Sequence, residues 1–308
     1  MSLKQTMTVF ELLDSAYVNG KAVVELFKDF AGVKASYQTV KETKASTDCI
    51  TILIPGSDGK SKGGNAPTLG IVGRLGGIGA RPSRIGLVSD ADGAVAAISS
   101  ALKLAQMQEN GDVLPGDVLV TTQICPNAPT QPHEPVDFMG APIDMATTNK
   151  YEVLPEMEAI LSIDTTKGNH FLNHKGYAIS CTIKDGWILR LSEDLIRIME
   201  MTSGKPAVTF PVSMQDITPY GNDIYHINSI VQPCTATTAP VVGVAICTET
   251  PVPGCSTGAS HEVDIALAVK FAVEVAKEYT RKTMTFYDET EFAKLQKQYG
   301  SMKHLLTK

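Results

Sequence analysis

The stretch IGLVSDADGAVAAISSALKLAQM, residues 85–107, carries the strongest fold signal in the chain. An apolar run at 85–88 leads to Asp90, and after Gly93 apolar residues recur at helical spacing as far as Met107. This pattern predicts a buried strand followed by a helix, the repeating unit of α/β proteins. Ligands of open α/β sheets bind at the carboxyl ends of strands, so we expect Asp90 to face a binding site.

The flanking sequence continues the alternation of strands and helices. Strands are expected at residues 35–40, 49–54, 68–73, 85–88, 117–123, 159–163, 177–183, 229–232 and 241–247, and helices at residues 9–13, 22–30, 91–110, 193–202 and 261–281. Asp164 and His261 each come just after a predicted strand or the loop that follows it. Five prolines in the segment 125–144 predict a long ordered loop.

These elements predict an α/β fold with three layers, α/β/α, around a mixed, mostly parallel central sheet. No linker, repeat or low-complexity tract divides the 308 residues, so we expect one domain over residues 1–308 with a C-terminal helical tail at 285–308.

Composition excludes several classes of protein. The net charge is -6 and no Lys/Arg cluster is present, which argues against a nucleic-acid partner. No apolar run approaches the roughly 18 residues of a membrane span, and the first residues lack the apolar centre of a signal peptide. The six cysteines show no CxxC spacing. We therefore expect a cytoplasmic protein without a membrane partner and without a disulfide framework.

Two short motifs match known functional sequences but lack residues that those functions require. Gly59-Lys60-Ser61 matches the end of a phosphate-binding loop, but its first glycine is missing, since Ile54 stands in that position. Residues 254–258, GCSTG, match a nucleophile elbow, yet the only separate histidine downstream is His304 in a charged tail. We read both as ordinary loops.

The order of elements resembles the di-zinc aminopeptidase superfamily, whose zinc ligands follow successive strands. Asp90 fits that superfamily's metal-bridging Asp, Asp164 fits its later Asp, and His261 fits the His that opens its last long helix. The resemblance covers most of the chain and implies a zinc-exopeptidase-like fold. As a whole, the chain looks more similar to an uncharacterised bacterial family of unknown function, with this fold and a degenerate metal site, than to any assayed peptidase.

The departures from the superfamily lie at the site itself. Arg74 stands where the resemblance places the first zinc-binding His, and Ile124 and Cys125 stand where it places the catalytic Glu-Glu pair. Since Arg is a permanent cation that can bind two carboxylates, Arg74 could fill the space of a metal between Asp90 and Asp164.

A single metal site remains conceivable in this altered arrangement. Asp90, Cys125 and His261 would give three ligands and one open position, as in a catalytic zinc site. His133 or Glu134 in the long loop would then be the candidate base that activates the bound water. Cys125 could instead act as a nucleophile or be a buried structural thiol.

Asp92 has two readings as well: a second metal ligand of the bridging type, or an acid stabilised by the amino end of the following helix. Arg74 and Asp92 are also the candidate substrate-binding residues.

Two functions follow from the resemblance. The first is a hydrolase of small peptides or amides that uses one zinc or another divalent metal, or Cys125. The second is a catalytically inactive relative that binds no metal and holds a small peptide-like ligand or a partner, with Arg74, Asp90, Asp164 and His261 in an ion-pair network. Homo-oligomerisation is implied by the superfamily alone.

Overall fold

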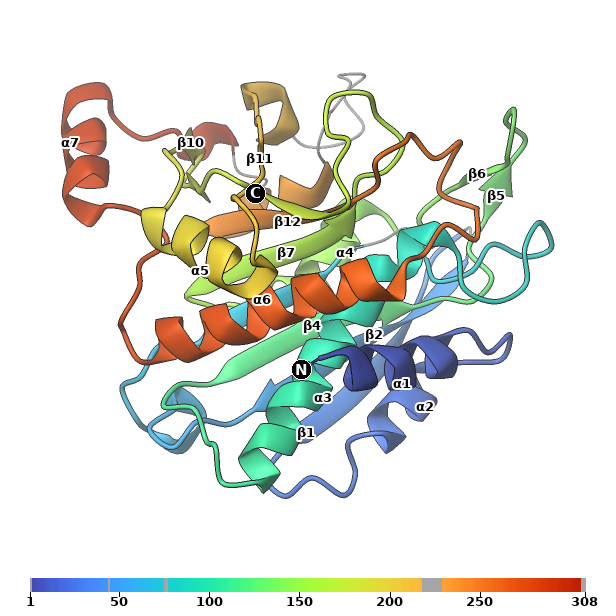
Figure 1. Ribbon diagram of the computed structural model, residues 1–308, viewed down its shortest axis with the longest axis horizontal. Helices are drawn as coiled ribbons and strands as arrows, with labels where there is room; N and C mark the ends of the chain where they lie inside the picture. Colours follow the sequence, from blue (N-terminus) through green and yellow to red (C-terminus); the bar gives the residue numbers. More distant parts are fainter. Residues whose placement is uncertain (1, 44, 75–76, 218–228, 306–308) are drawn as a thin grey trace.

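The computed structural model describes residues 2–43, 45–74, 77–217 and 229–305. Its centre is one large sheet whose strands lie in the order β1-β2-β4-β3-β7-β12-β8-β11 (Figure 1). These strands are β1 (Lys34–Lys41), β2 (Ser46–Ile54), β4 (Val118–Ile124), β3 (Leu69–Gly73), β7 (Ala159–Thr165), β12 (Val241–Cys247), β8 (Gly176–Ser180) and β11 (Thr209–Phe210). Two short strands, β9 (Ile183–Lys184) and β10 (Trp187–Ile188), extend it beside β12.

The direction of the strands confirms the predicted mixed, mostly parallel sheet. Strands β4, β3, β7 and β12 run parallel at the centre, whereas β1 and β2 form an antiparallel hairpin at one edge and β8 runs antiparallel to β12. The central strands are buried along their whole length, as parallel strands covered on both faces must be.

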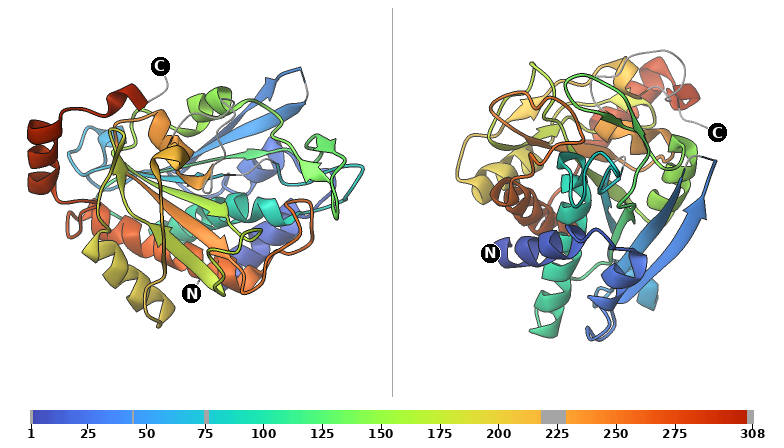
Figure 2. Two further views of the ribbon diagram at one scale, coloured as in Figure 1. Left: turned by 90° about the horizontal axis from the view of Figure 1, so that it is seen from above. Right: turned by 90° about the vertical axis from the view of Figure 1, so that its right-hand side faces the viewer.

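Helices cover both faces of the sheet. One face carries α1 (Leu3–Leu13), α3 (Asp92–Glu109), α5 (Glu193–Ser203) and α6 (Glu262–Thr280), which gather on one side in both views of Figure 2. The short helices α2 (Gly20–Glu25) and α4 (Met145–Glu152) pack beside the β1–β2 edge. The other face is covered by α4 and by two 3-10 helices, η3 (Met214–Ile217) and η4 (Ser229–Thr235), over a second apolar cluster.

Close packing of α3 against the sheet fixes the position of the loop before it. A Cβ on Gly93 would lie 2.4 Å from the Arg74 carbonyl oxygen and 2.5 Å from that of Ile163. Only glycine therefore lets the first turn of α3 rest on the ends of β3 and β7. This contact places Asp90 and Asp92 beside the residues that follow those two strands.

Two predicted strands are wrong. Residues 85–88 form a loop, in which Ile85 is 73% exposed and Gly86 has a φ of +86°, although Leu87 and Val88 are buried. Residues 229–232 belong to η4, where Ile230 and Val231 are buried against β12 in helical rather than extended backbone. Short apolar runs do not distinguish these alternatives.

The segment 125–144 was expected to be a loop without regular structure, but it contains secondary structure. It contains a two-stranded hairpin of β5 (Thr130–Gln131) and β6 (Phe138–Met139). Toward the C-terminus, α7 (Glu289–Tyr299) projects at the edge of the molecule and is followed by the 3-10 turn η5 (Lys303–Leu305) (Figure 1).

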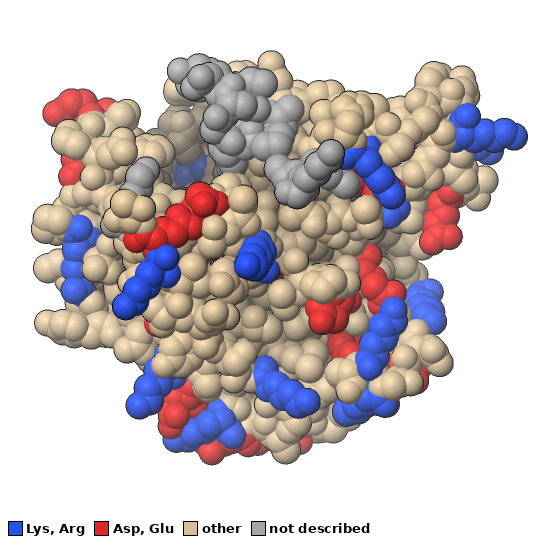
Figure 3. Space-filling model, turned by 180° about the vertical axis from the view of Figure 1, so that it is seen from behind, with Lys and Arg blue, Asp and Glu red and all other residues tan. Residues whose placement is uncertain are grey.

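On the face shown in Figure 3, Lys and Arg side chains are intermixed with Asp and Glu side chains, so this face is not dominated by one sign of charge. Within the described ranges, the helices are too short or too polar to cross a bilayer.

Candidate functional site

Polar side chains meet at the carboxyl ends of the central strands. Arg74 follows β3, Asp164 lies near the end of β7, and Lys167 comes three residues later in the loop toward β8. The first turn of α3 supplies Asp92 from the same side, and Asp90 lies in the short 3-10 turn η2 (Ser89–Ala91) just before it. The structure therefore brings Asp90, Asp92, Asp164 and Arg74 to one edge of the sheet.

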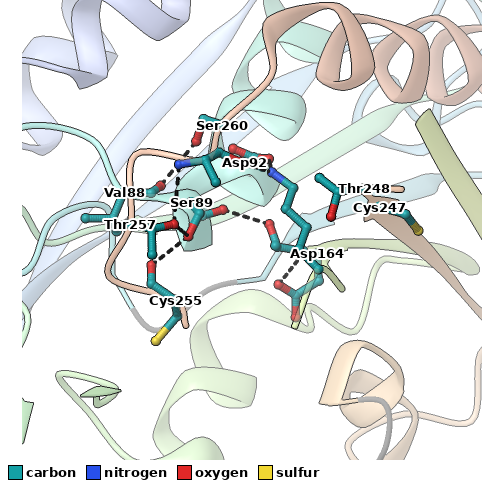
Figure 4. Close-up of polar contacts among 12 residues, drawn as sticks. Val88, Ser89, Asp92, Asp164, Cys247, Thr248, Cys255, Thr257 and Ser260 are labelled. Atoms are coloured by element: carbon teal, nitrogen blue, oxygen red, sulfur yellow. Dashed lines mark hydrogen bonds and ion pairs between the residues drawn. The ribbon is translucent and has the colours of Figure 1, made fainter. Parts of the chain in front are cut away.

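A buried ion pair joins Lys167 to Asp92 (Figure 4). Their side chains are 2% and 0% exposed, and the Lys167 Nζ also donates a hydrogen bond of 2.7 Å to the Ala259 carbonyl oxygen. Burial raises the pKa of Asp92, while the nearby Lys167 charge opposes that rise. The ammonium group of Lys167 is thus held between Asp92 and the Ala259 carbonyl group.

A second buried ion pair holds Arg74. Its guanidinium donates to Glu152 Oε2 at 2.8 Å and to Asn149 Oδ1 at 3.1 Å, both on α4, and it also contacts the Met145 sulfur. Burial raises the pKa of Glu152, and the attraction of Arg74 opposes this effect. Helix α4 thus brings to the guanidinium a carboxylate that the sequence did not predict, while the Arg74 charge also lowers the pKa of Asp164. The bridge from Arg74 to Asp90 and Asp164 stays a prediction.

Asp90 and Asp164 form a pair of neighbouring carboxyl groups. Burial raises the pKa of Asp164 well above its ordinary value, and the Asp90 charge adds to that rise. The Thr165 backbone N–H, which donates to Asp164 Oδ1 at 2.7 Å, and the charge of Arg74 act in the opposite direction. Burial and the neighbouring Asp90 carboxyl group thus both favour the neutral form of Asp164.

Ser89 fastens the loop 248–260 to the start of α3 (Figure 4). Its hydroxyl donates to the Cys255 carbonyl oxygen at 2.9 Å and accepts from Thr257 Oγ1 at 3.0 Å, while its backbone N–H donates to the Thr257 carbonyl oxygen at 2.7 Å. The Thr165 hydroxyl donates to the Ser89 carbonyl oxygen at 3.0 Å. Three separate segments are thereby held at one point beside Asp92.

The predicted zinc set of Asp90, Cys125 and His261 is not brought together. Cys125 is buried in a small apolar cluster with Ala80, Val88, Ala128 and Met139, and burial raises the pKa of its thiol to about 11. Such a thiol carries little thiolate near neutral pH, so its surroundings are those of a structural cysteine. His261 lies at the exposed N-cap of α6, where its charge acts to lower the pKa of Asp92.

The two candidate bases lie away from the acids of the site. His133 and Glu134 are exposed in the β5–β6 hairpin, and the His133 Nδ1 lies 3.1 Å from the Val136 carbonyl oxygen. Within the described residues, neither side chain has a hydrogen bond or ion pair with Asp90, Asp164 or His261.

The donor set does not fit a metal ion. In the part of the chain that the structure describes, His, Cys, Asp and Glu side chains form no group of three or more that could hold one. Asp92 and Glu152, the carboxylates deepest in the site, already have Lys167 and Arg74 as counter-charges. A divalent cation would meet two fixed positive charges there.

A groove of about 530 Å³ opens next to the Lys167–Asp92 pair. It is formed by residues 248–253 after β12, by Thr257 and Ala259, and by the start of α6 at His261 and Asp264, with Lys175 at its rim. Thr257 and Ala259 belong to both the groove and the polar network, so the two are continuous.

Fold and site together define an α/β protein with a buried polar network at the carboxyl edge of a mixed sheet. The chain belongs to the family described as protein of unknown function (DUF1177), which it matches over residues 38–308. No curated protein sequence matches it.

One similar solved structure is that of the bottromycin maturation enzyme BotP in complex with Mn. The likeness has a TM-score of 0.51 at 13% sequence identity and covers 90% of this chain and 71% of BotP. At this identity the likeness shows a shared fold, in agreement with the α/β class expected from the sequence.

Proposed function

We propose that this protein binds a small peptide-like or amide ligand at the carboxyl ends of β7 and β12, and that it does so without the metals of the zinc aminopeptidases that its sequence resembles. The observation that carries the proposal is the buried Lys167–Asp92 ion pair. It gives the buried Asp92 carboxylate an ammonium partner at the edge of the sheet where the resemblance implies metal ligands.

The two buried ion pairs leave no electrostatic role for a metal. Arg74 and Lys167 each neutralise a carboxylate that would otherwise be buried with its charge uncompensated. Because burial also favours the neutral form of Asp164, the remaining carboxyl pair is a weaker metal donor than two ionised groups. The thiol of Cys125 is likewise protonated at neutral pH. These features favour binding over metal-assisted hydrolysis.

The groove offers charges of both signs to a ligand. Glu249 and the buried Asp264 can pair with an ammonium group, and Lys175 can pair with a carboxylate. The loop residues 248–253 add backbone groups that can hydrogen-bond an amide. A dipeptide carries these three kinds of group within a volume that such a groove accommodates.

Calorimetric titration with alanyl-alanine tests the proposal. We expect binding to the wild type, a loss of about tenfold in affinity for Lys175→Met, and no change for Lys4→Met, a matched exposed lysine on α1. The dipeptide should be recovered intact, with or without added Mn²⁺ or Zn²⁺. Absence of binding would reject the ligand, and metal-dependent cleavage would support the alternative function, suggested by the Mn in the BotP structure.

A further inference from the structure

A second cavity lies at the opposite edge of the sheet, where the parallel strands begin. It has a volume of about 610 Å³ and is larger than the groove at the candidate site. Pro67, Met157 and Pro240 precede β3, β7 and β12 along one wall, and the segment from the end of α6 to the start of α7 forms the other. The function proposed above does not involve this cavity.

The cavity lining combines polar side chains with an apolar and aromatic part. Met157, Met284 and Phe286 are each at most 4% exposed, and they form a rigid base. Tyr279 and Tyr287 are partly buried beside them, and burial raises the pKa of both phenols. Such a lining suits a compact apolar group.

The cationic residue Lys184 lies among these aromatic rings. Its Nζ is 5.3 Å from the centroid of the Tyr287 ring and 5.4 Å from that of Phe292, and it donates one hydrogen bond, of 2.7 Å, to the Thr238 carbonyl oxygen. The side chain is half-buried, and that burial lowers its pKa. Among the described residues no carboxylate lies within ion-pair distance of this ammonium.

The acids around the cavity do not neutralise Lys184. Glu158 is paired with Lys60 at 2.7 Å and also accepts the Thr68 backbone N–H. Asp185, and to a smaller extent Glu289, raise the pKa of Lys184 through their charge without forming an ion pair with it, and Lys303 opposes them. The cavity therefore presents a partly desolvated cation with unused donor capacity next to an apolar surface.

We infer that this cavity is a second ligand site, which binds a small carboxylate with an apolar body. The carboxylate accepts a charge-assisted hydrogen bond from Lys184, and the apolar body lies between the tyrosines and the methionines. A neutral or cationic analogue of the same shape lacks the first interaction. The site is independent of the peptide-like ligand proposed above.

The fluorescence emission of Trp187 can report binding at this site. It is the only tryptophan of the chain and is the cross-strand partner of Lys184 in the β9–β10 hairpin. Directly paired residues of an antiparallel hairpin have side chains on the same face, so we expect occupancy next to Lys184 to change the emission of Trp187.

The test is a titration with phenylacetate, followed by Trp187 emission and by calorimetry, with phenylacetamide and phenethylamine as neutral and cationic controls. We expect saturable binding of phenylacetate at millimolar concentrations and at least about tenfold weaker binding of both controls. Lys184→Met should weaken phenylacetate binding by about tenfold, Lys184→Arg should largely retain it, and Lys294→Met on the exposed face of α7 should leave it unchanged.

Equal binding of phenylacetate and phenylacetamide, or no binding to the wild type, would overturn the inference without any variant. Lys175→Met should not affect phenylacetate, so a failure here is distinguishable from a failure of the proposed dipeptide site.

Discussion

Replacing Lys167 by Met is expected to lower the free energy of unfolding by about 3–5 kcal/mol, because it leaves the buried Asp92 carboxylate without its counter-charge. It also removes the hydrogen bond to the Ala259 carbonyl oxygen, which helps hold the loop before α6. Urea unfolding at neutral pH measures the loss. Lys270→Met, which also removes one lysine hydrogen bond to a carbonyl but at an exposed position, should cost less than about 1 kcal/mol.

The loss in the Lys167→Met variant should depend on pH. Burial raises the folded-state pKa of Asp92 above its unfolded value, and without Lys167 nothing of comparable strength opposes that rise. The folded state then binds the proton more tightly than the unfolded state, so the destabilisation shrinks as the pH falls through the folded-state pKa. Addition of Asp92→Asn should restore most of the stability at neutral pH. A single variant as stable as the wild type would contradict the ion pair.

Replacing Arg74 by Met is expected to cost a similar amount, about 3–5 kcal/mol, because Glu152 is 1% exposed and Arg74 is its only ion-pair partner among the described residues. Chemical unfolding again provides the measurement. The matched control is Arg190→Met, which removes exposed pairs with Asp288 and Glu291 and should cost only about 0–1 kcal/mol.

A double variant, Arg74→Met with Glu152→Met, separates charge from packing. It removes both charges and keeps an apolar side chain at each position, so we expect it to recover much of the stability lost in Arg74→Met. If the double variant is as unstable as the single one, the pair acts through shape and hydrogen bonds to Asn149 rather than through charge.

Much of the fold could be predicted from the sequence, because long periodic segments carry a strong signal. The helix predicted at 91–110 is α3, and the strands predicted at 159–163 and 241–247 are β7 and β12. Helix α4 was missed because its sequence, MATTNKYE, is polar with no apolar stripe. The run at 85–88 was wrongly predicted as a strand. Its apolar residues lie in a loop with a positive-φ glycine, and the pattern of residue types does not reveal that backbone conformation.

The site was only partly predictable. Strand-end position was enough to place Asp164 and Arg74 at one edge of the sheet, whereas Asp90 reaches that edge from the turn η2 and not from a strand at 85–88. Partners depend on tertiary contacts, so Lys167 and Glu152 were missed although they complete the two ion pairs. Lys167 could have been proposed from the sequence, because it lies in the loop just after Asp164 at the end of a strand. Nothing in the sequence around Glu152 indicates that it pairs with Arg74.

The metal content of gently purified protein tests the central claim most directly. Plasma mass spectrometry would be applied to the wild type and to Asp164→Ala, before and after incubation with Zn²⁺ and Mn²⁺ and removal of the excess. Because Arg74 and Lys167 supply the positive charge of the site, we expect far less than stoichiometric metal in both proteins. Stoichiometric zinc or manganese in the wild type that is lost in Asp164→Ala would contradict a site built on ion pairs.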